Sequence, residues 1–250
     1  MVTQLAALTL ALVGAVALAI YGIRQGRALR ESQGESPFKS FAGEVGRVAE
    51  EGAGIHVSLG SGGLLGEQGM VSVAALQGLD SLVELSAAYG TPPIITTGDP
   101  TLYLLADNRL RRAYGQLGRA RNYPAAAVHF SASDPLPYAA MAATMTSDHP
   151  IATSINLGAF DQEVSLLTHT ALNRRAKLFG GAVSIEGLAA LYPVVPSERM
   201  VMGEELFSGG AVATGRPAHW ASLKVQNVLR ILVIVGIFLA AIASVLGLEV

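Results

Sequence analysis

Two long apolar stretches lie near the ends of this chain, at residues 2–23 and 231–248, and neither contains a charged side chain. A helix of about 20 residues rises about 30 Å, which is the thickness of the hydrocarbon core of a bilayer. Each stretch is therefore long enough to span a membrane. The sequence predicts one transmembrane helix at residues 2–23, a second at 228–248, and one water-soluble domain between them.

Charges beside the apolar stretches predict how the chain is oriented. No Lys or Arg precedes the first stretch or follows the second. The flanking positive charges all lie on the side of the middle domain, at Arg24, Arg27, Arg30, Lys39, Arg216, Lys224 and Arg230. Under the positive-inside rule, we expect a double-pass protein of the cell membrane, with a cytoplasmic domain and both termini outside.

The first stretch has an alternative interpretation as a cleaved signal peptide. Small residues at positions 15, 17 and 19 offer cleavage sites. A signal peptide begins with basic residues, however, which this segment lacks, and the Arg residues behind it would oppose export. An uncleaved anchor is the favoured interpretation, and cleavage stays an open alternative.

Small side chains recur every four residues along both stretches. They are Ala7, Ala11, Ala15 and Ala19 in the first, and Gly236, Ala240 and Ser244 in the second. This spacing forms a groove along which membrane helices pack closely, although Ala and Gly are also common in such segments without that role. These seven residues are the candidate helix-packing positions.

Between the two stretches, short apolar runs alternate with longer segments of helical periodicity. After a linker at residues 24–54, with one short helix expected around residues 41–51, the runs begin at residues 55, 93, 126, 151 and 178. The last helical segment, at residues 187–206, is interrupted by Pro193 and Pro196. This alternation is typical of parallel strands joined by right-handed helical crossovers. The predicted fold class is α/β, a doubly wound, Rossmann-like parallel sheet of about five strands at residues 55–215.

Composition limits the kinds of site that the domain contains. The absence of Cys excludes disulfides and thiolate nucleophiles or ligands. The His residues show no metal-binding spacing, so we expect no metal and no cofactor. His56 and His129 would lie on adjoining strands in a flavodoxin-like strand order, so a His pair is a minor hypothesis. The net charge of −2 gives no indication of nucleic-acid binding, which we do not expect.

A glycine-rich turn follows the first predicted strand and contains Gly60, Ser61, Gly62 and Gly63. Such a turn lets backbone amides approach an anion closely, and it lies where a dinucleotide fingerprint would lie. The fingerprint is incomplete, because its third glycine would be residue 65, which is Leu65. Phosphate or nucleotide binding and a purely structural tight turn are both open interpretations.

Asp-Pro pairs open the helices that follow the second and third predicted strands. The two turns, which begin at Asp99 and Asp134, share the pattern Asp-Pro-x-x-Tyr. An Asp N-cap followed by Pro has a complete structural reason to occur. Both carboxylates are also candidate ligand-binding residues, because doubly wound sheets bind ligands at the turns that follow their strands. A hydrolase or transferase that uses Asp99, Asp134 or Ser61 is less favoured, since no nucleophile and base lie at catalytic spacing.

Basic residues cluster at the ends of two predicted helices. They include Arg109, Arg111 and Arg112 in one helix, and Arg174 and Arg175 in another. Cations are favoured at helix C-termini by the helix dipole. If this edge of the domain faced the membrane, the same residues would also attract anionic headgroups. These five residues are the candidate membrane-surface residues.

The segment from Gly54 to Gly63, the turn Thr97-Gly98-Asp99-Pro100 and the two apolar ends resemble a family of uncharacterised bacterial membrane proteins that carry a domain of unknown function. The resemblance covers nearly the whole chain. It implies a double-anchored unit and brings no established catalytic residue.

These features predict a function that depends on attachment and assembly. We expect a membrane-anchored structural or assembly protein rather than an enzyme. Its cytoplasmic domain would self-associate or dock on a membrane complex. The expected partners are the lipid bilayer and further copies of the chain or a membrane complex. The alternative is a membrane-tethered module that binds or senses an anionic small molecule or nucleotide at the glycine-rich turn.

Overall fold

The computed structural model of the chain describes residues 37–65, 68–203, 205–214, 230–231, 233–238 and 241–242. The chain divides into two compact units. One runs from Ser36 to Gly215, and the other combines Met1–Glu35 with Arg216–Val250. The Ser36–Gly215 unit contains the sheet and is called the α/β unit below.

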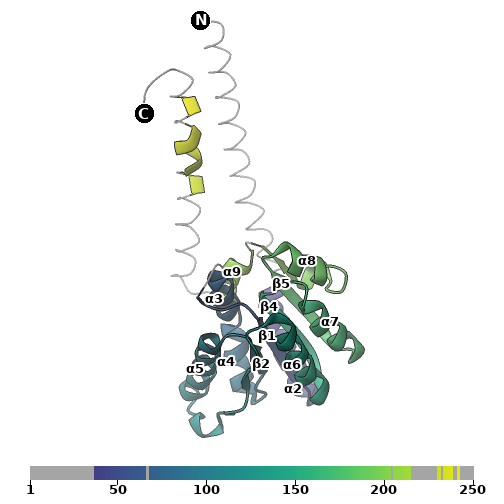
Figure 1. Ribbon diagram of the computed structural model, residues 1–250. Helices are drawn as coiled ribbons and strands as arrows, with labels where there is room; N and C mark the ends of the chain where they lie inside the picture. The colour runs from purple at the N-terminus through teal and green to yellow at the C-terminus, as the bar shows by residue number, and fades with distance from the viewer. Residues whose placement is uncertain are drawn as a thin grey trace, which may run out of the picture. The chain divides into compact units, whose positions relative to one another are not determined.

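A six-stranded, entirely parallel sheet forms the centre of the α/β unit (Figure 1). Its strands lie in the order β3-β2-β1-β4-β5-β6, so the first and fourth strands are neighbours in the middle. The strands are β1 (Gly54–Gly60), β2 (Ile94–Thr97), β3 (Val128–Phe130), β4 (Ile151–Ala159), β5 (Lys177–Ala182) and β6 (Met200–Met202). The predicted α/β class and parallel sheet are therefore confirmed.

Helices cover both faces of the sheet. Five helices share one apolar core with one face, and they are α2 (Pro37–Glu51), α3 (Gly69–Gly78), α4 (Asp80–Tyr89), α5 (Pro100–Gln116) and α9 (Glu205–Thr214). The other face is covered by α6 (Pro135–Asp148), α7 (Val164–Asn173) and α8 (Ile185–Leu191). Short 3₁₀ turns lie at Ala120–Asn122 and Ser197–Arg199. This is the layering expected when helical crossovers join parallel strands.

The compact unit begins earlier than the predicted domain because α2 belongs to its core. Residues 24–54 were expected to be mostly linker, but Phe38, Phe41, Val45 and Val48 recur at helical spacing on α2 and are buried. The rings of Phe41 and Phe179 pack edge to face, with 5.4 Å between their centroids. α2 therefore anchors one side of the sheet rather than leading to it.

α2 also reverses the direction of the chain. Only Gly52 and Ala53 separate α2 from β1, so the helix runs back along the sheet from its carboxyl edge, where the strands end, to its amino edge, where they begin. α9 follows β6 closely and packs beside α3 near the carboxyl edge (Figure 1). Both ends of the α/β unit therefore lie toward the carboxyl edge.

The prediction of about five strands was wrong by one. The segment expected as an interrupted helix at residues 187–206 instead contains the end of α8, a 3₁₀ turn, β6 and the start of α9. α8 ends at Leu191, two residues before Pro193, because proline cannot continue a helix. Residues 71–89, one of the longer segments of helical periodicity, form two helices, α3 and α4, which meet at Leu79.

The second unit is described only in its C-terminal part. Residues 230–231, 233–238 and 241–242 are helical, within the second predicted anchor and its flank, whereas the first predicted anchor lies outside the described residues. Among the described residues, the one helical stretch long and apolar enough to cross a membrane is Gly69–Tyr89. That stretch comprises α3 and α4, and 61% of its most apolar window is buried, as in the core helix of a folded domain.

Candidate functional site

The candidate site lies where the strand order of the sheet reverses. β1 and β4 are neighbours, and the connections that follow them lead to helices on opposite faces. Doubly wound sheets bind ligands at the carboxyl edge of such a switch point. The glycine-rich turn follows β1 at this place, so the sequence prediction of its position is consistent with the fold.

The glycine-rich turn packs tightly against its neighbours. A Cβ added to Gly62 would lie 2.4 Å from the Cβ of Ala159, and one added to Gly98 would lie 2.7 Å from the Cα of Ser61. Gly60 has a φ of 91°, a backbone conformation that favours glycine. The three loops after β1, β2 and β4 therefore meet closely, and the glycines have a structural reason to occur.

Carboxylates surround this turn. A Cβ added to Gly63 would lie 2.9 Å from Oδ2 of Asp99, and Ser61 Oγ donates a hydrogen bond of 3.0 Å to Oε1 of Glu163. The other oxygen of Glu163, Oε2, accepts a 3.0 Å hydrogen bond from the backbone N–H of Asp161. Glu163 is buried and makes no ion pair with a described residue. Two carboxylates so placed repel an anion at the turn.

The two predicted Asp-Pro turns differ in their contacts. Asp99 caps α5, because its Oδ1 accepts a 2.7 Å hydrogen bond from Leu102 N–H. Asp134 occupies the N-cap position of α6 but makes no capping hydrogen bond, and its side chain is exposed. The structure therefore brings Asp99 together with Gly60, Ser61, Gly62 and Gly63. Asp134 follows β3, at the end of the sheet two strands away from β1.

A buried polar network lies beneath the turn, between the sheet and α6. Tyr138 Oη lies 2.5 Å from Ser58 Oγ and accepts a 3.1 Å hydrogen bond from the backbone N–H of Gly60. Burial raises the pKa of Tyr138, so its hydroxyl stays protonated. Tyr138 is the last residue of the second Asp-Pro-x-x-Tyr pattern, and it holds the end of β1 where the glycine-rich turn starts.

His56 extends this network away from the turn. Its Nε2 lies 3.0 Å from Thr96 Oγ1 and its Nδ1 lies 3.2 Å from Thr146 Oγ1. Complete burial lowers the pKa of His56 to about 3, with smaller contributions from His129 and His149. The predicted adjacency of His56 and His129 was wrong, because the strand order is not flavodoxin-like and β2 lies between β1 and β3.

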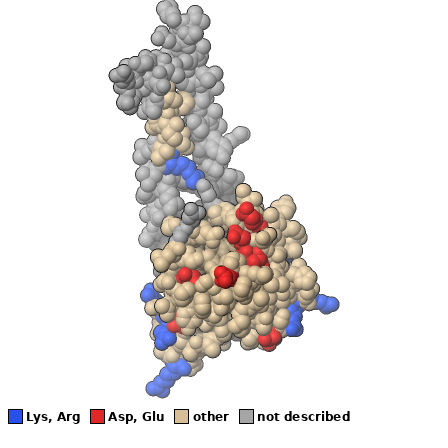
Figure 2. Space-filling model, in the orientation of Figure 1, with Lys and Arg blue, Asp and Glu red and all other residues tan. Residues whose placement is uncertain are grey.

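The basic residues lie at the opposite edge of the sheet. Most Lys and Arg side chains of the α/β unit visible in Figure 2 lie toward its amino edge, whereas most acidic side chains visible on the same face lie nearer the carboxyl edge. Lys39, in the first turn of α2, is an exception. Arg109 pairs with Asp80, Arg111 with Asp107, and Arg174 binds the carbonyl oxygen of Ser147. Arg112 and Arg175 are exposed.

The prediction that the basic edge faces the membrane assumed that the chain enters the domain at the amino edge, and the structure differs on this point. The chain was expected to reach the amino edge directly from a linker, but α2 brings it in from the carboxyl edge. The candidate membrane-surface residues therefore lie at the edge remote from both ends of the α/β unit.

The candidate helix-packing positions lie almost entirely outside the described residues. Gly236 is the exception, and a Cβ added there would meet nothing within 4 Å. The groove of small side chains in the two apolar stretches stays a prediction.

The arrangement at the switch point favours hydrogen-bond donors over anions. Glu163 and Asp99 present carboxylate oxygens beside the turn, and both accept hydrogen bonds from backbone N–H groups. Among the described residues, no group of three or more His, Asp or Glu side chains could hold a metal ion. Sequence reasoning missed Glu163 and Tyr138, although the repeated Tyr of the Asp-Pro-x-x-Tyr pattern was a signal for the second.

Comparison with known proteins identifies the family of this chain without assigning a function. Neither the curated proteins nor the solved structures contain a match. A family model described as a domain of unknown function, DUF6754, matches residues 2–250, and the chain therefore belongs to that family.

Proposed function

We propose that this protein is a membrane-anchored structural or assembly protein, whose α/β unit acts through contacts with further copies or with a membrane complex. The observation that carries the proposal is the packing at the switch point. There Gly62 and Gly98 pack against protein atoms, and Asp99 and Glu163 place negative charge beside the turn. At the position where this fold usually binds a ligand, the protein's own atoms pack closely around the turn.

Exposed apolar side chains beside an edge strand also support assembly. Leu104 and Leu105 are exposed on α5, which packs on the edge strand β3, and Phe130 is exposed at the end of β3. An edge strand with unpaired backbone groups and apolar neighbours is suited to contacts between chains.

Membrane anchorage is the second part of the proposal. The two uncharged apolar stretches, with basic residues only on the side of the α/β unit, support a double-pass protein with this unit in the cytoplasm. Small residues at four-residue spacing in both stretches would let helices of neighbouring chains approach closely.

Mass measurement of the full chain in mild detergent tests the assembly. Light scattering should give a protein mass of twice 25.9 kDa, or a higher whole multiple, over a range of concentrations. A cysteine introduced at Phe130 in this cysteine-free chain should form cross-links between copies, whereas one at Leu166, on the outer side of α7, should not. A strict monomer in detergent that also fails to cross-link in membranes would refute self-association.

The second candidate function is a membrane-tethered binding module at the glycine-rich turn, and Glu163 is the observation that favours it. A buried carboxylate normally has a cationic partner, and this one has none among the described residues. A ligand with an ammonium or hydroxyl group would pair with the Glu163 carboxylate better than a phosphate or nucleotide would.

Thermal-shift measurements on the full chain distinguish the two ligand classes. A binding module of this kind should be stabilised by amines and not by nucleotides, and Glu163→Gln should abolish the shift. Stabilisation by nucleotides would instead support a site for anionic ligands at the glycine-rich turn. If neither amines nor nucleotides stabilised the protein, assembly would be the one function still supported.

A further inference from the structure

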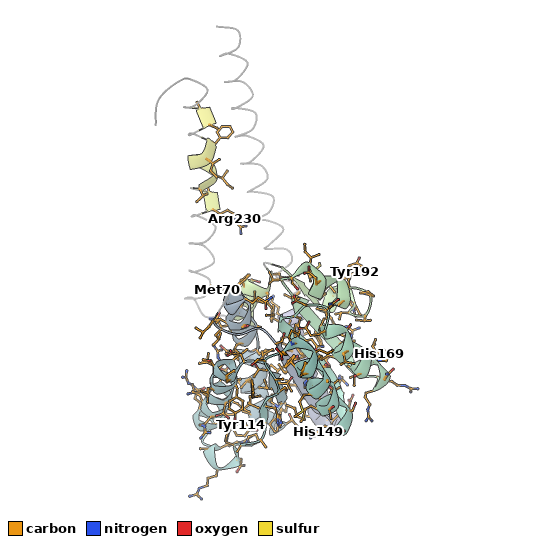
Figure 3. The ribbon with its side chains drawn as sticks, in the orientation of Figure 1. Met70, Tyr114, His149, His169, Tyr192 and Arg230 are labelled. Carbon is orange, nitrogen blue, oxygen red and sulfur yellow. The ribbon has the colours of Figure 1, made fainter. Side chains whose placement is uncertain are left out.

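Large apolar side chains are exposed along the carboxyl edge of the sheet. Leu65 lies between β1 and α3 with 95% of its surface exposed, Met70 in the first turn of α3 with 68%, and Ile185 at the start of α8 with 81%. Val183 follows β5 and Met202 ends β6, and both are exposed as well. Figure 3 shows Met70 at one end of the unit and Tyr114 and His149 at the other. We call these five residues the apolar edge.

The apolar edge coincides with the places where the chain enters and leaves the α/β unit. α2 starts toward the carboxyl edge, and α9 lies beside α3 near the same edge. Beyond these points, residues 24–36 and 215–230 lead to the two apolar stretches. A single edge of the unit therefore carries both connections and the exposed apolar side chains.

We propose that the carboxyl edge of the α/β unit rests on the surface of the lipid bilayer, with the apolar edge in the headgroup region. The proposal rests on the membrane anchorage proposed above. Residues 24–36 reach at most about 45 Å when extended, and the nine-residue strand β4 is about 30 Å long. If the amino edge faced the lipid instead, residues 24–36 and 215–230 would each have to run the length of the sheet to reach the membrane. For residues 24–36, that distance takes up most of their extended length.

Charge does not decide this contact. Asp134 and Glu186 are exposed at the carboxyl edge, but Lys39 in the first turn of α2 is exposed there as well. The connections at residues 24–36 and 215–230 add further basic residues, namely Arg24, Arg27, Arg30, Arg216, Lys224 and Arg230. Apolar contact therefore holds this edge on the bilayer, and it does not depend on the charge of the lipid headgroups.

Fluorophores at single introduced cysteines test the proposal in the full chain. The chain has no Cys of its own, so each label is unique. Labels at Met70 and Ile185 report on the apolar edge, and labels at Arg112 and Leu117, also exposed, report on the amino edge. A label at Val235 reports on the second predicted anchor. The protein is reconstituted in phosphatidylcholine vesicles that contain lipid-bound quenchers, with iodide as the quencher in water.

We expect headgroup-level lipid quenchers to act on labels at positions 70 and 185 at least threefold more than on those at 112 and 117. A deep quencher should act on the label at 235. Raising the salt concentration should leave the quenching at positions 70 and 185 unchanged, because apolar contact is not screened by salt. Loss of this quenching at high salt would overturn the proposal.

The remaining outcomes separate this inference from the proposed anchorage. If the label at 235 is in water, the anchorage and the inference both fail. If 235 is in lipid but iodide quenches 70 and 185 as strongly as 112, the anchorage stands and the inference is wrong. If 70 and 185 are shielded from both quenchers, protein covers the apolar edge, and the inference is also wrong.

Discussion

The hydroxyl groups of Ser58 and Tyr138 lie 2.5 Å apart in the interior of the α/β unit, and they join β1 to α6. The same Tyr138 oxygen accepts a hydrogen bond from Gly60 N–H, at the start of the glycine-rich turn. One buried phenol therefore connects a central strand, a helix and the turn at the switch point.

Replacement of Tyr138 by Phe should destabilise the α/β unit by about 1–3 kcal/mol, because Ser58 and Gly60 N–H lose a buried partner. Chemical unfolding of the full chain in detergent, followed by circular dichroism, measures the change. Tyr103→Phe is the matched control, since Tyr103 holds the same place in the first Asp-Pro-x-x-Tyr pattern and its hydroxyl makes no hydrogen bond to a described residue. Equal losses in the two variants would contradict the role of Tyr138.

Stability should fall as pH decreases from 6.5 to 5, because His56 is neutral in the folded protein. Its pKa is lowered to about 3 in the fold, so the unfolded chain, with an ordinary pKa near 6.5, binds the extra proton in this range. The loss at pH 5 should be about 2 kcal/mol. Unfolding at a series of pH values measures it, and His56→Gln should flatten the curve. A variant curve as steep as that of the original protein would exclude His56 as the cause.

Glu44 should contribute far more to stability than Glu51, although both belong to α2 and pair with Arg47. The side chain of Glu44 is 6% exposed and also binds Lys177 and Thr153, whereas that of Glu51 is 47% exposed. Glu44→Ala should cost about 3 kcal/mol by leaving buried polar groups unpaired, and Glu51→Ala less than about 1 kcal/mol.

The contribution of Glu44 to stability should also depend on pH. Burial alone would raise the pKa of Glu44, but hydrogen bonds from Lys177 and Arg47 lower it below the ordinary value. This stability is therefore present above pH 4.5 and is lost as pH falls through the lowered pKa. Glu44→Gln should remove that acid-sensitive component, as seen in acid unfolding. An unchanged acid transition would show that other carboxylates are responsible.

Gly98 and Gly43 should respond to alanine in opposite directions. A Cβ at position 98 would lie 2.7 Å from the Cα of Ser61 and 2.8 Å from the carbonyl oxygen of Ala132, so Gly98→Ala should cost roughly 2 kcal/mol. A Cβ at position 43 in α2 would meet nothing within 4 Å, and Gly43→Ala should add about 0.5–1 kcal/mol. Shifts of the unfolding midpoint measure both. If Gly98→Ala were neutral, the packing of the turn would be looser than described.

Most strands of the fold were predictable because their apolar runs are followed by long amphipathic segments. β6 was not, since Met200–Met202 is short and follows a segment broken by Pro193 and Pro196. α2 was predicted only in part, as a short helix around residues 41–51 within a linker, because the Ser, Gly and Pro before it resemble a linker and hide the apolar spacing from Phe38 to Val48.

The site was predictable only in part, for a topological reason. Strand ends of a parallel sheet share one edge, so the proximity of Gly63 and Asp99 followed from local patterns. The contact between Ser61 and Glu163 depends on β1 and β4 being neighbours, and strand order is decided by the packing of the whole domain. A flavodoxin-like order, on which the His-pair hypothesis depended, would have placed β3 beside β1 instead.

The polar layer beneath α6 has a consequence for how the sheet is aligned. Ile55, Val57 and Leu59 on the opposite face of β1 make contacts that tolerate sliding, because apolar surfaces attract without direction. His56 and Ser58 instead need oxygen or nitrogen partners at fixed positions on β2 and α6. A slip of β1 by two residues would keep the apolar face filled and leave these groups unsatisfied. The polar layer thus fixes the register of β1, because it destabilises alignments that apolar contacts alone would permit.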